Sequence, residues 1–389
     1  MKRYLLQVIV STILSTTTCV TGFSQTVENP VIRDYIYHES SLIDGKDGYF
    51  YSFVSSIVPR DSTNFKLYYT VSIFRSSDLE EWKFFKYALS SKDIQQRFLG
   101  NYDKTHRLAG KFALRGKKNE IKYYPIWAPD VIRYKDRYLL FVALRKSSDD
   151  TKIAVFEANS LSEDFRFVNV IVSNCPEDKE AYFPSREQID PFPIVDGDDF
   201  YLVFGSFVNA SNGKTLDSRK GMGVYMVRLD PSQGFKMKEH PHFITNNYEG
   251  VIILKHNKAY YLLGSNGSIR NYTYKVSYAK SMTIEGPYLN EDGKSIADTL
   301  NINFGTTILQ TYKDSRFNGF GCPSLPVKDK KGRLWMLVFG HAPEYAPINS
   351  NDAAKERYTF LLEFQWDRKG NPFFDVNAIE RNSQRKPVL

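Results

Sequence analysis

Hydrophobic and polar positions follow one unit that occurs five times along the chain. Each unit opens with a short polar or acidic element, continues as a run of Val, Ile and Leu, passes a polar turn and enters a second strand of aromatic and aliphatic residues. The five second strands are residues 49–51, 138–141, 200–204, 260–263 and 334–338. A unit that recurs at roughly 60 to 90 residues is typical of a radial repeat, in which each unit forms one four-stranded blade around a shared axis. The pattern therefore predicts an all-β protein folded as a five-bladed β-propeller.

The heads of the five units set the spacing of the predicted blades. They lie at Glu39, Asp130, Asp190, Glu249 and Cys322, with steps of 91, 60, 59 and 73 residues. We attribute the long first step to a polar, basic insertion at 90–124, which we expect to form a loop over one rim. Near the end of the chain, residues 360–366 either complete the last blade or close the ring together with residues 31–35.

Outer strands and turn signals agree with this architecture. Candidate third strands are residues 70–74, 152–156, 224–227 and 275–278. Pairs such as Asp-Gly at 44–45, 47–48, 196–197 and 292–293 favour hairpins. We therefore expect a predominantly β chain with few helices.

The first residues resemble an export signal. Lys2 and Arg3 precede an apolar stretch at 4–14 that is too short to span a membrane. We expect residues 1–24 to be removed as a signal peptide and residues 25–389 to form a single propeller domain, which would be periplasmic or extracellular. A lipid anchor at Cys19 is the alternative. Of the remaining cysteines, we expect Cys175 and Cys322 to be free thiols, although export would permit a bridge.

Composition and charge limit the partners. The chain is 42% hydrophobic and 15% aromatic, which suffices for a large core, and aromatic rings also pack on the C–H faces of sugars. The formal net charge of +8 is modest for 389 residues, and the cations are scattered except near 111–122 and 381–386. This distribution argues against nucleic-acid binding, whereas a basic rim would favour an acidic polysaccharide. No protein partner is indicated, and we expect a monomer.

Four of the five heads are carboxylates, which would share one pocket if the heads converge on the axis. Glycoside hydrolysis needs a protonated carboxyl to assist the leaving oxygen and, in an inverting mechanism, a second carboxylate roughly 6.5 to 9.5 Å away to activate water. Blade heads on opposite sides of an axis can supply this separation. Repeat logic does not assign the roles, since each carboxylate could instead cap a strand or accept a bond from a nearby backbone N–H.

At this point the chain resembles glycoside hydrolase family 43, a family of five-bladed propellers, over nearly all of its mature length. The segments Trp-Ala-Pro-Asp-Val-Ile at 127–132 and Ile-Asp-Pro at 189–191, followed by Tyr-Leu-Val-Phe-Gly-Ser-Phe at 201–207, are similar to the signatures of its second and third blades. Motifs at 286–294, 304–309, 319–322 and 364–367 are most similar to endo-acting α-1,5-arabinanases. The resemblance implies that Glu249 is the general acid and that Asp130 positions this acid and tunes its pKa.

The general base is where the sequence departs from the family pattern. Arabinanases carry His-Asp-Pro-Ser in the first blade, whereas this chain has His38, Glu39, Ser40 and Ser41. Glu is one methylene longer than Asp, and a displacement on the order of 1 Å can cost about a hundredfold in rate. We expect Glu39 to serve as the base, with Asp34 or Asp190 as the alternative base, or impaired hydrolysis as the alternative outcome.

A second departure concerns the axis, where arabinanases place a His near a central ion or water cluster and this chain has Cys322. A neutral thiol is a poor ligand for calcium. We expect no required cofactor, with backbone carbonyls and water as the remaining ligands for an axial calcium or other ion. His341 matches a family His close to the site, and a buried, hydrogen-bonded His is the equally simple interpretation.

For sugar contacts, we expect Trp127 and Phe207 to act as stacking platforms, and His38, Asp190 and Ser206 to form hydrogen bonds. Core packing is the competing interpretation for both rings.

These observations favour an exported, inverting glycoside hydrolase that acts on arabinose-containing plant cell-wall polysaccharide. The alternatives are a β-xylosidase, an arabinofuranosidase or a galactan-cleaving exo-enzyme of the same fold, a propeller that binds glycan without cutting it, and a protein-interaction propeller. The insertion at 90–124 would favour exo action and an open groove endo action, so both modes stay open.

Overall fold

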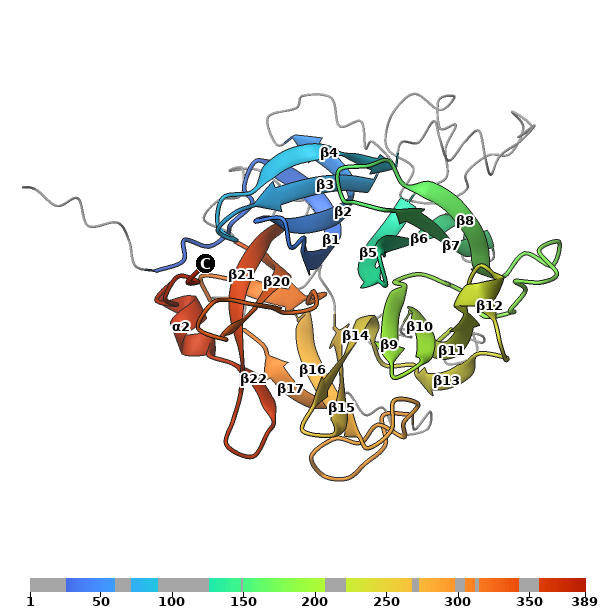
Figure 1. The fold of residues 1–389 in the computed structure, drawn as a ribbon. Helices are drawn as coiled ribbons and strands as arrows, with labels where there is room; N and C mark the ends of the chain where they lie inside the picture. Colours follow the sequence, from blue (N-terminus) through green and yellow to red (C-terminus); the bar gives the residue numbers. More distant parts are fainter. Residues whose placement is uncertain are drawn as a thin grey trace, which may run out of the picture.

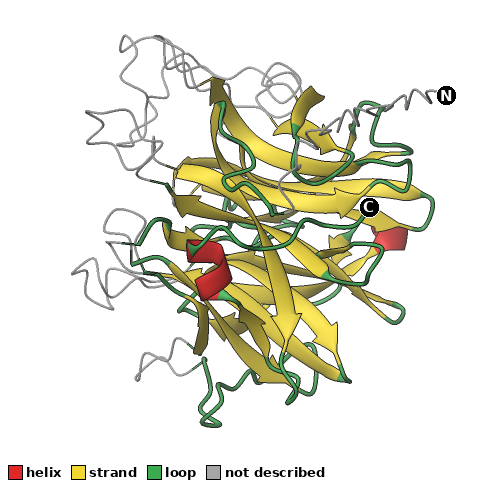
Figure 2. Ribbon diagram, turned by 90° about the vertical axis from the view of Figure 1, so that its left-hand side faces the viewer, coloured by secondary structure: helices red, strands yellow, loops and turns green. Residues whose placement is uncertain are grey.

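The protein forms a ring of five β-sheets, as shown by a computed structural model that describes residues 26–59, 71–89, 126–147, 150–206, 222–267, 273–297, 305–311, 315–342 and 357–389. Figure 1 shows the sheets arranged around a central axis, with β1, β5, β9 and β14 nearest to it. Figure 2 shows that nearly all regular structure is strand. The prediction of an all-β, five-bladed propeller is thus confirmed.

Each blade is a sequential antiparallel sheet. Blade 1 comprises β1 (Tyr35–Asp44), β2 (Phe50–Pro59), β3 (Val71–Ser76) and β4 (Lys83–Leu89), and blade 2 comprises β5 (Ile126–Tyr134), β6 (Arg137–Ser147), β7 (Asp150–Ala158) and β8 (Arg166–Ser173). Blade 3 comprises β9 (Phe192–Asp196), β10 (Asp199–Gly205), β11 (Val224–Asp230), β12 (Lys236–Met237) and β13 (His242–Thr245). Blade 4 comprises β14 (Glu249–His256), β15 (Ala259–Asn266), β16 (Lys275–Ser281) and β17 (Thr306–Leu309). Blade 5 comprises β18 (Asn318–Gly321), β19 (Val327–Lys328), β20 (Leu334–His341), β21 (Arg357–Trp366) and β22 (Pro372–Phe374).

Helical structure is scarce in the described part of the chain, as expected. It consists of a 3-10 turn, η3 (Pro231–Gln233), and one short helix, α2 (Val376–Glu380). Neither has the length or the apolar character needed to cross a membrane. The predicted signal peptide and the insertion at 90–124 lie outside the described residues.

The second strand of each blade is mostly apolar because both of its faces are buried. In β6, Leu139 and Phe141 pack toward blade 3, whereas Leu140 and Val142 pack toward blade 1. Successive side chains of a strand point to opposite faces of the sheet, so a strand between two neighbouring blades needs apolar residues at every position. This explains the continuous aromatic and aliphatic runs that mark the second strand of each unit.

The ring is closed by the first described residues, which add to the outer edge of blade 5. Ile32 forms an isolated bridge with Thr359, and the side-chain amide of Asn29 pairs with the backbone of Leu361 in both directions. The Asn29 Nδ2 donates to the Leu361 carbonyl at 2.9 Å, and the Leu361 N–H donates to Asn29 Oδ1 at 2.8 Å. β21 is therefore the third strand of the last blade and also the contact that joins the two ends of the chain.

Asn29 should contribute measurably to stability, because it is 2% exposed and satisfies two buried backbone groups. Each group left without a partner costs about 1–3 kcal/mol, so we expect Asn29→Ala to lower the free energy of unfolding by about 2–4 kcal/mol. Urea denaturation would measure this loss, with Asn159→Ala as the control because Asn159 is exposed. Equal midpoints for the two variants would contradict this account of ring closure.

Candidate active site

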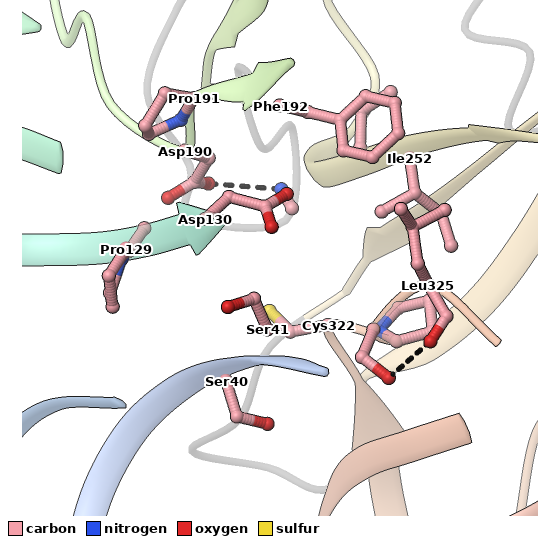
Figure 3. A pocket seen from close by; sticks show the side chains of 15 residues that line it. Ser40, Ser41, Pro129, Asp130, Asp190, Pro191, Phe192, Ile252, Cys322 and Leu325 are labelled. Carbon is pink, nitrogen blue, oxygen red and sulfur yellow. Dashed lines mark hydrogen bonds between the residues drawn. The ribbon is translucent and has the colours of Figure 1, made fainter. Parts of the chain in front are cut away.

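A pocket on the propeller axis is lined by one short segment from each blade. The segments are 40–41, 128–130, 190–192, 250–252 and 322–325. Figure 3 shows Asp130 and Asp190 on one side of this pocket and Ser41 and Cys322 on the other. The heads of the five units thus converge as the repeat spacing predicted.

A left-handed backbone residue marks the same position in four of the five segments. Ala128, Asp190, Gly250 and Cys322 have φ values of 42°, 52°, 56° and 47°. The register of β5 and β14 shifts at this point, and the register of β1 shifts on both sides of His38. Bulges of this kind bend a strand and re-aim its side chains, and they are common at rims and beside active sites.

These bulges correct the expected alignment of the repeats. The sequence placed Asp130, Asp190 and Glu249 at one equivalent position. In the structure, the equivalents of Asp190 are Ala128 and Gly250, so Asp130 lies two residues further along its strand and Glu249 lies one residue earlier. The carboxylates therefore occupy successive levels along the axis, and only Asp130 and Asp190 line the described pocket.

Asp130 is held at the pocket wall by β5. Its Oδ1 accepts a hydrogen bond from the Val131 N–H at 2.7 Å. Burial in the protein raises the pKa of Asp130 to about 8, and the bond from Val131 opposes this rise only in part. At neutral pH, Asp130 therefore carries a proton and can donate a hydrogen bond into the pocket.

Asp190 links blade 3 to blade 4. It is 7% exposed, and its Oδ2 accepts a hydrogen bond from the Gly250 N–H at 2.9 Å. This contact fixes the backbone directly after Glu249, which places Asp190 in a positioning role within the described residues. The direct hydrogen bond that we expect between Asp190 and a sugar stays a prediction.

Glu249 begins β14, immediately before the pocket-lining segment of blade 4. Its Oε1 accepts a hydrogen bond of 2.5 Å from the hydroxyl of Tyr274, and the same hydroxyl lies 3.2 Å from the Cys322 sulfur. Sequence reasoning found Glu249 but missed Tyr274, because Tyr274 lies on the approach to a third strand and belongs to no recognised motif.

Backbone register places two further predicted residues at the level of Glu249. His38 pairs with Ser55 and Trp127 with Ala143, as Glu249 pairs with Ser265. One face of the Trp127 ring is covered by the Arg145 guanidinium, whose carbon is 4.8 Å from the ring centroid. Arg145 in turn forms two bonds of 2.7 Å with Glu187, so a sugar could stack only on the opposite face of Trp127.

The other residues predicted to contact sugar or to act as the base are Ser206, Phe207, His38 and Glu39. Ser206 is buried directly after β10 and does not line the pocket. Phe207 lies outside the described residues, as do the side chains of His38 and Glu39, so these assignments stay predictions. By its backbone, Glu39 is the bulged residue of β1, since His38 pairs with Ser55 and Ser40 with Val54.

Two serines of blade 1 were noted in the sequence without a role. Ser40 and Ser41 line the pocket and are 8% and 6% exposed. Among the described residues, neither hydroxyl has a hydrogen-bond partner. A buried hydroxyl without a partner is costly, so these groups are available to an incoming polar ligand.

Few side-chain oxygens lie at the level of the bulges, so backbone carbonyls and water stay the expected ligands for an axial ion. Calcium takes about six to eight oxygen ligands, and the bulge positions at this level supply Ala128, Asp190, Gly250 and Cys322. Within the described ranges, no group of three or more His, Cys, Asp or Glu side chains could hold a metal. Both Cys175 and Cys322 are free thiols, as predicted.

His341 is a buried residue rather than a pocket-lining one. It lies at the end of β20 with 1% exposure, and burial lowers its pKa to about 4. The imidazole is therefore neutral at physiological pH.

Similarity to known proteins agrees with the geometry. The model of glycosyl hydrolases family 43 matches residues 27–372. An extracellular endo-alpha-(1->5)-L-arabinanase 1 of Bacillus subtilis (strain 168) is 27% identical over 197 residues, which is 48% of this chain and 54% of that protein. An extracellular endo-alpha-(1->5)-L-arabinanase of Thermotoga petrophila is 22% identical over 334 residues, which is 79% of this chain and 63% of that protein. The chain thus spans about half to two thirds of the length of these relatives.

Solved structures share the fold at low sequence identity. The Cellvibrio cellulosa alpha-L-arabinanase in complex with arabinohexaose has a TM-score of 0.62 and 18% identity, covering 91% of this chain and 99% of that one. The BlXynB protein of Bacillus licheniformis has a TM-score of 0.61 and 17% identity, covering 94% of this chain and 59% of that one. Because the family model matches most of the chain, the protein belongs to glycosyl hydrolases family 43.

Proposed function

We propose that the protein is an exported glycoside hydrolase that cleaves arabinan-like α-L-arabinofuranosyl linkages with inversion of configuration. The observation that carries this proposal is the convergence of one short segment from each of the five blades on one axial pocket, with Asp130 and Asp190 in its wall and Glu249 directly before the segment of blade 4. The names of the curated relatives support arabinan as the substrate class and export as the destination.

The mechanism assigns one task to each carboxyl group. Glu249 gives its proton to the leaving oxygen, and Glu39 takes a proton from the water that attacks the anomeric carbon from the opposite face. Glu39 is suited to this task because it lies at a register shift of β1, directly before the pocket-lining residues Ser40 and Ser41.

Asp130 controls the charge of the site. While protonated, it adds no negative charge to the pocket and offers a hydrogen bond. Once ionised, it favours the protonated form of nearby carboxyl groups, because like charges disfavour one another. Because burial raises the pKa of Asp130 to about 8, this change occurs just above neutral pH.

Glu249→Gln should lower the kcat on linear arabinan by a factor of about 10²–10⁴, which is the usual contribution of a general acid. An aryl arabinofuranoside with a good leaving group needs no proton, so we expect its hydrolysis to be largely retained. Reducing-sugar release and phenolate release measure the two rates, and Glu285→Gln is the control because Glu285 is an exposed residue of the same blade. Equal losses on both substrates would remove Glu249 from the role of acid.

Glu39→Gln should instead lower hydrolysis of both substrates by at least about a hundredfold, because activation of water is needed whatever the leaving group. ¹H NMR of the first product should show the β-anomer released from an α-arabinofuranoside. Full activity in Glu39→Gln would transfer the base to Asp190 or Asp34, and early release of the α-anomer would refute inversion.

Binding of arabino-oligosaccharide without any cleavage would favour the non-catalytic propeller, and cleavage of aryl xyloside alone would favour a xylosidase.

Asp130 should make stability depend on pH. Its pKa is about 8 in the folded protein and 3.8 in the reference state, so between these values the folded chain holds a proton that the unfolded chain has released. Stability therefore falls as pH rises through this window, and is highest below its lower limit. Asp130→Asn lacks the ionising group, so its Tm should rise relative to the unmodified protein as pH increases from 4 to 9. Asp198→Asn, in an exposed turn, should follow the unmodified protein, and a pH-independent Tm difference for Asp130→Asn would contradict the prediction.

A further inference from the structure

A line of three polar groups connects the axis to the proposed acid. The sulfur of Cys322 lies 3.2 Å from the hydroxyl oxygen of Tyr274, which lies 2.5 Å from Glu249 Oε1. Tyr274 is 3% exposed, so bulk water does not compete for its hydroxyl. The three residues come from the head of β14, the approach to β16 and the end of β18.

The direction of the hydrogen bonds follows from the number of protons. Burial raises the pKa of Tyr274 well above its usual value, and the nearby Cys322 and Glu249 raise it further, so the phenol keeps its proton. The Tyr274 hydroxyl donates to Glu249 Oε1, and a protonated Glu249 keeps this bond when its own proton is on Oε2. The only proton of the phenol is then used, and the Cys322 thiol donates to the Tyr274 oxygen.

Steric contacts hold this line in place. Gly321 leaves room for the Tyr274 ring, since a Cβ there would lie 1.9 Å from the ring carbon Cε1. The Cys322 N–H donates to Ser265 Oγ at 2.6 Å, which anchors the thiol from blade 4. The Tyr274 ring therefore packs directly against the backbone of blade 5 on one side.

We propose that Tyr274 is a positioning residue for Glu249, with the Cys322 thiol as the donor that supports it. This inference rests on the role of Glu249 as the acid. Because Oε1 is occupied as an acceptor, the proton that goes to the leaving oxygen resides on Oε2. A hydrogen bond donated to a carboxylate also favours its charged form, so loss of the Tyr274 hydroxyl should favour the protonated form of Glu249.

Direct titration of Glu249 tests the hydrogen bond without any need for turnover. The ¹³C signal of its carboxyl carbon would be identified by its loss in Glu249→Gln and followed against pH. Removing one hydrogen bond to a charged group should raise the pKa of Glu249 by about one unit in Tyr274→Phe. Tyr278→Phe is the matched control, because Tyr278 is 2% exposed and its hydroxyl bonds to Glu291 at 2.8 Å, outside the pocket. An unchanged midpoint in Tyr274→Phe would overturn the proposal.

Kinetics test whether the positioning matters for cleavage. In Tyr274→Phe, the kcat on arabinan should fall about tenfold with little change in KM, since even small misplacement of a reacting group is costly. The fall in kcat/KM at high pH should move upward, because activity requires protonated Glu249. Cys322→Ser keeps a donor and should show a smaller shift than Cys322→Ala. If Tyr274→Phe shifts the titration of Glu249 while the unmodified protein cleaves no substrate, the hydrogen bond is supported and the proposed function is refuted. Normal cleavage by Tyr274→Phe would refute the positioning role.

Discussion

Ring closure is the constraint on which the rest of the structure depends. The last blade must be joined to the first to close the ring of five sheets, and the pairing of residues 29–32 with β21 supplies that joint. Two apolar clusters, with Leu42 and Leu337 in one and Val54 and Phe339 in the other, fill the seam between blades 5 and 1. Every distance across the axis depends on this seam, including the separation between blade 1 and the carboxyl groups of blades 2 to 4.

The carboxylates of the site lie at different heights along the propeller axis and do not form a single ring of equivalent positions. At the level of the bulge, backbone conformation is repeated around the axis while the side chains differ. One residue earlier the chain places His38, Trp127 and Glu249, and two residues later it places Ser41 and Asp130. A substrate that enters along the axis would therefore meet a different set of groups at each depth.

Much of the architecture could be predicted from the sequence, because a strand buried on both faces needs an uninterrupted apolar run, and five such runs are plain in the chain. Glu249 and Asp130 could be identified because they stand beside these runs in recognisable motifs. The relative levels of the carboxylates could not be predicted, since a bulge adds a residue without leaving a consistent residue type: Ala128, Asp190, Gly250 and Cys322 all adopt the same conformation. Tyr274 was missed for a related reason, because its role arises from a contact across two blades.

Gly250 and Cys322 face one small space between blades 4 and 5 at the level of the bulge. A Cβ on residue 250 would lie 3.0 Å from the Cys322 sulfur, so the space between blades 4 and 5 holds one side chain at this height. The Cys322 sulfur occupies that space. The two positions thus form a steric pair, in which a larger residue at one position requires a small residue at the other.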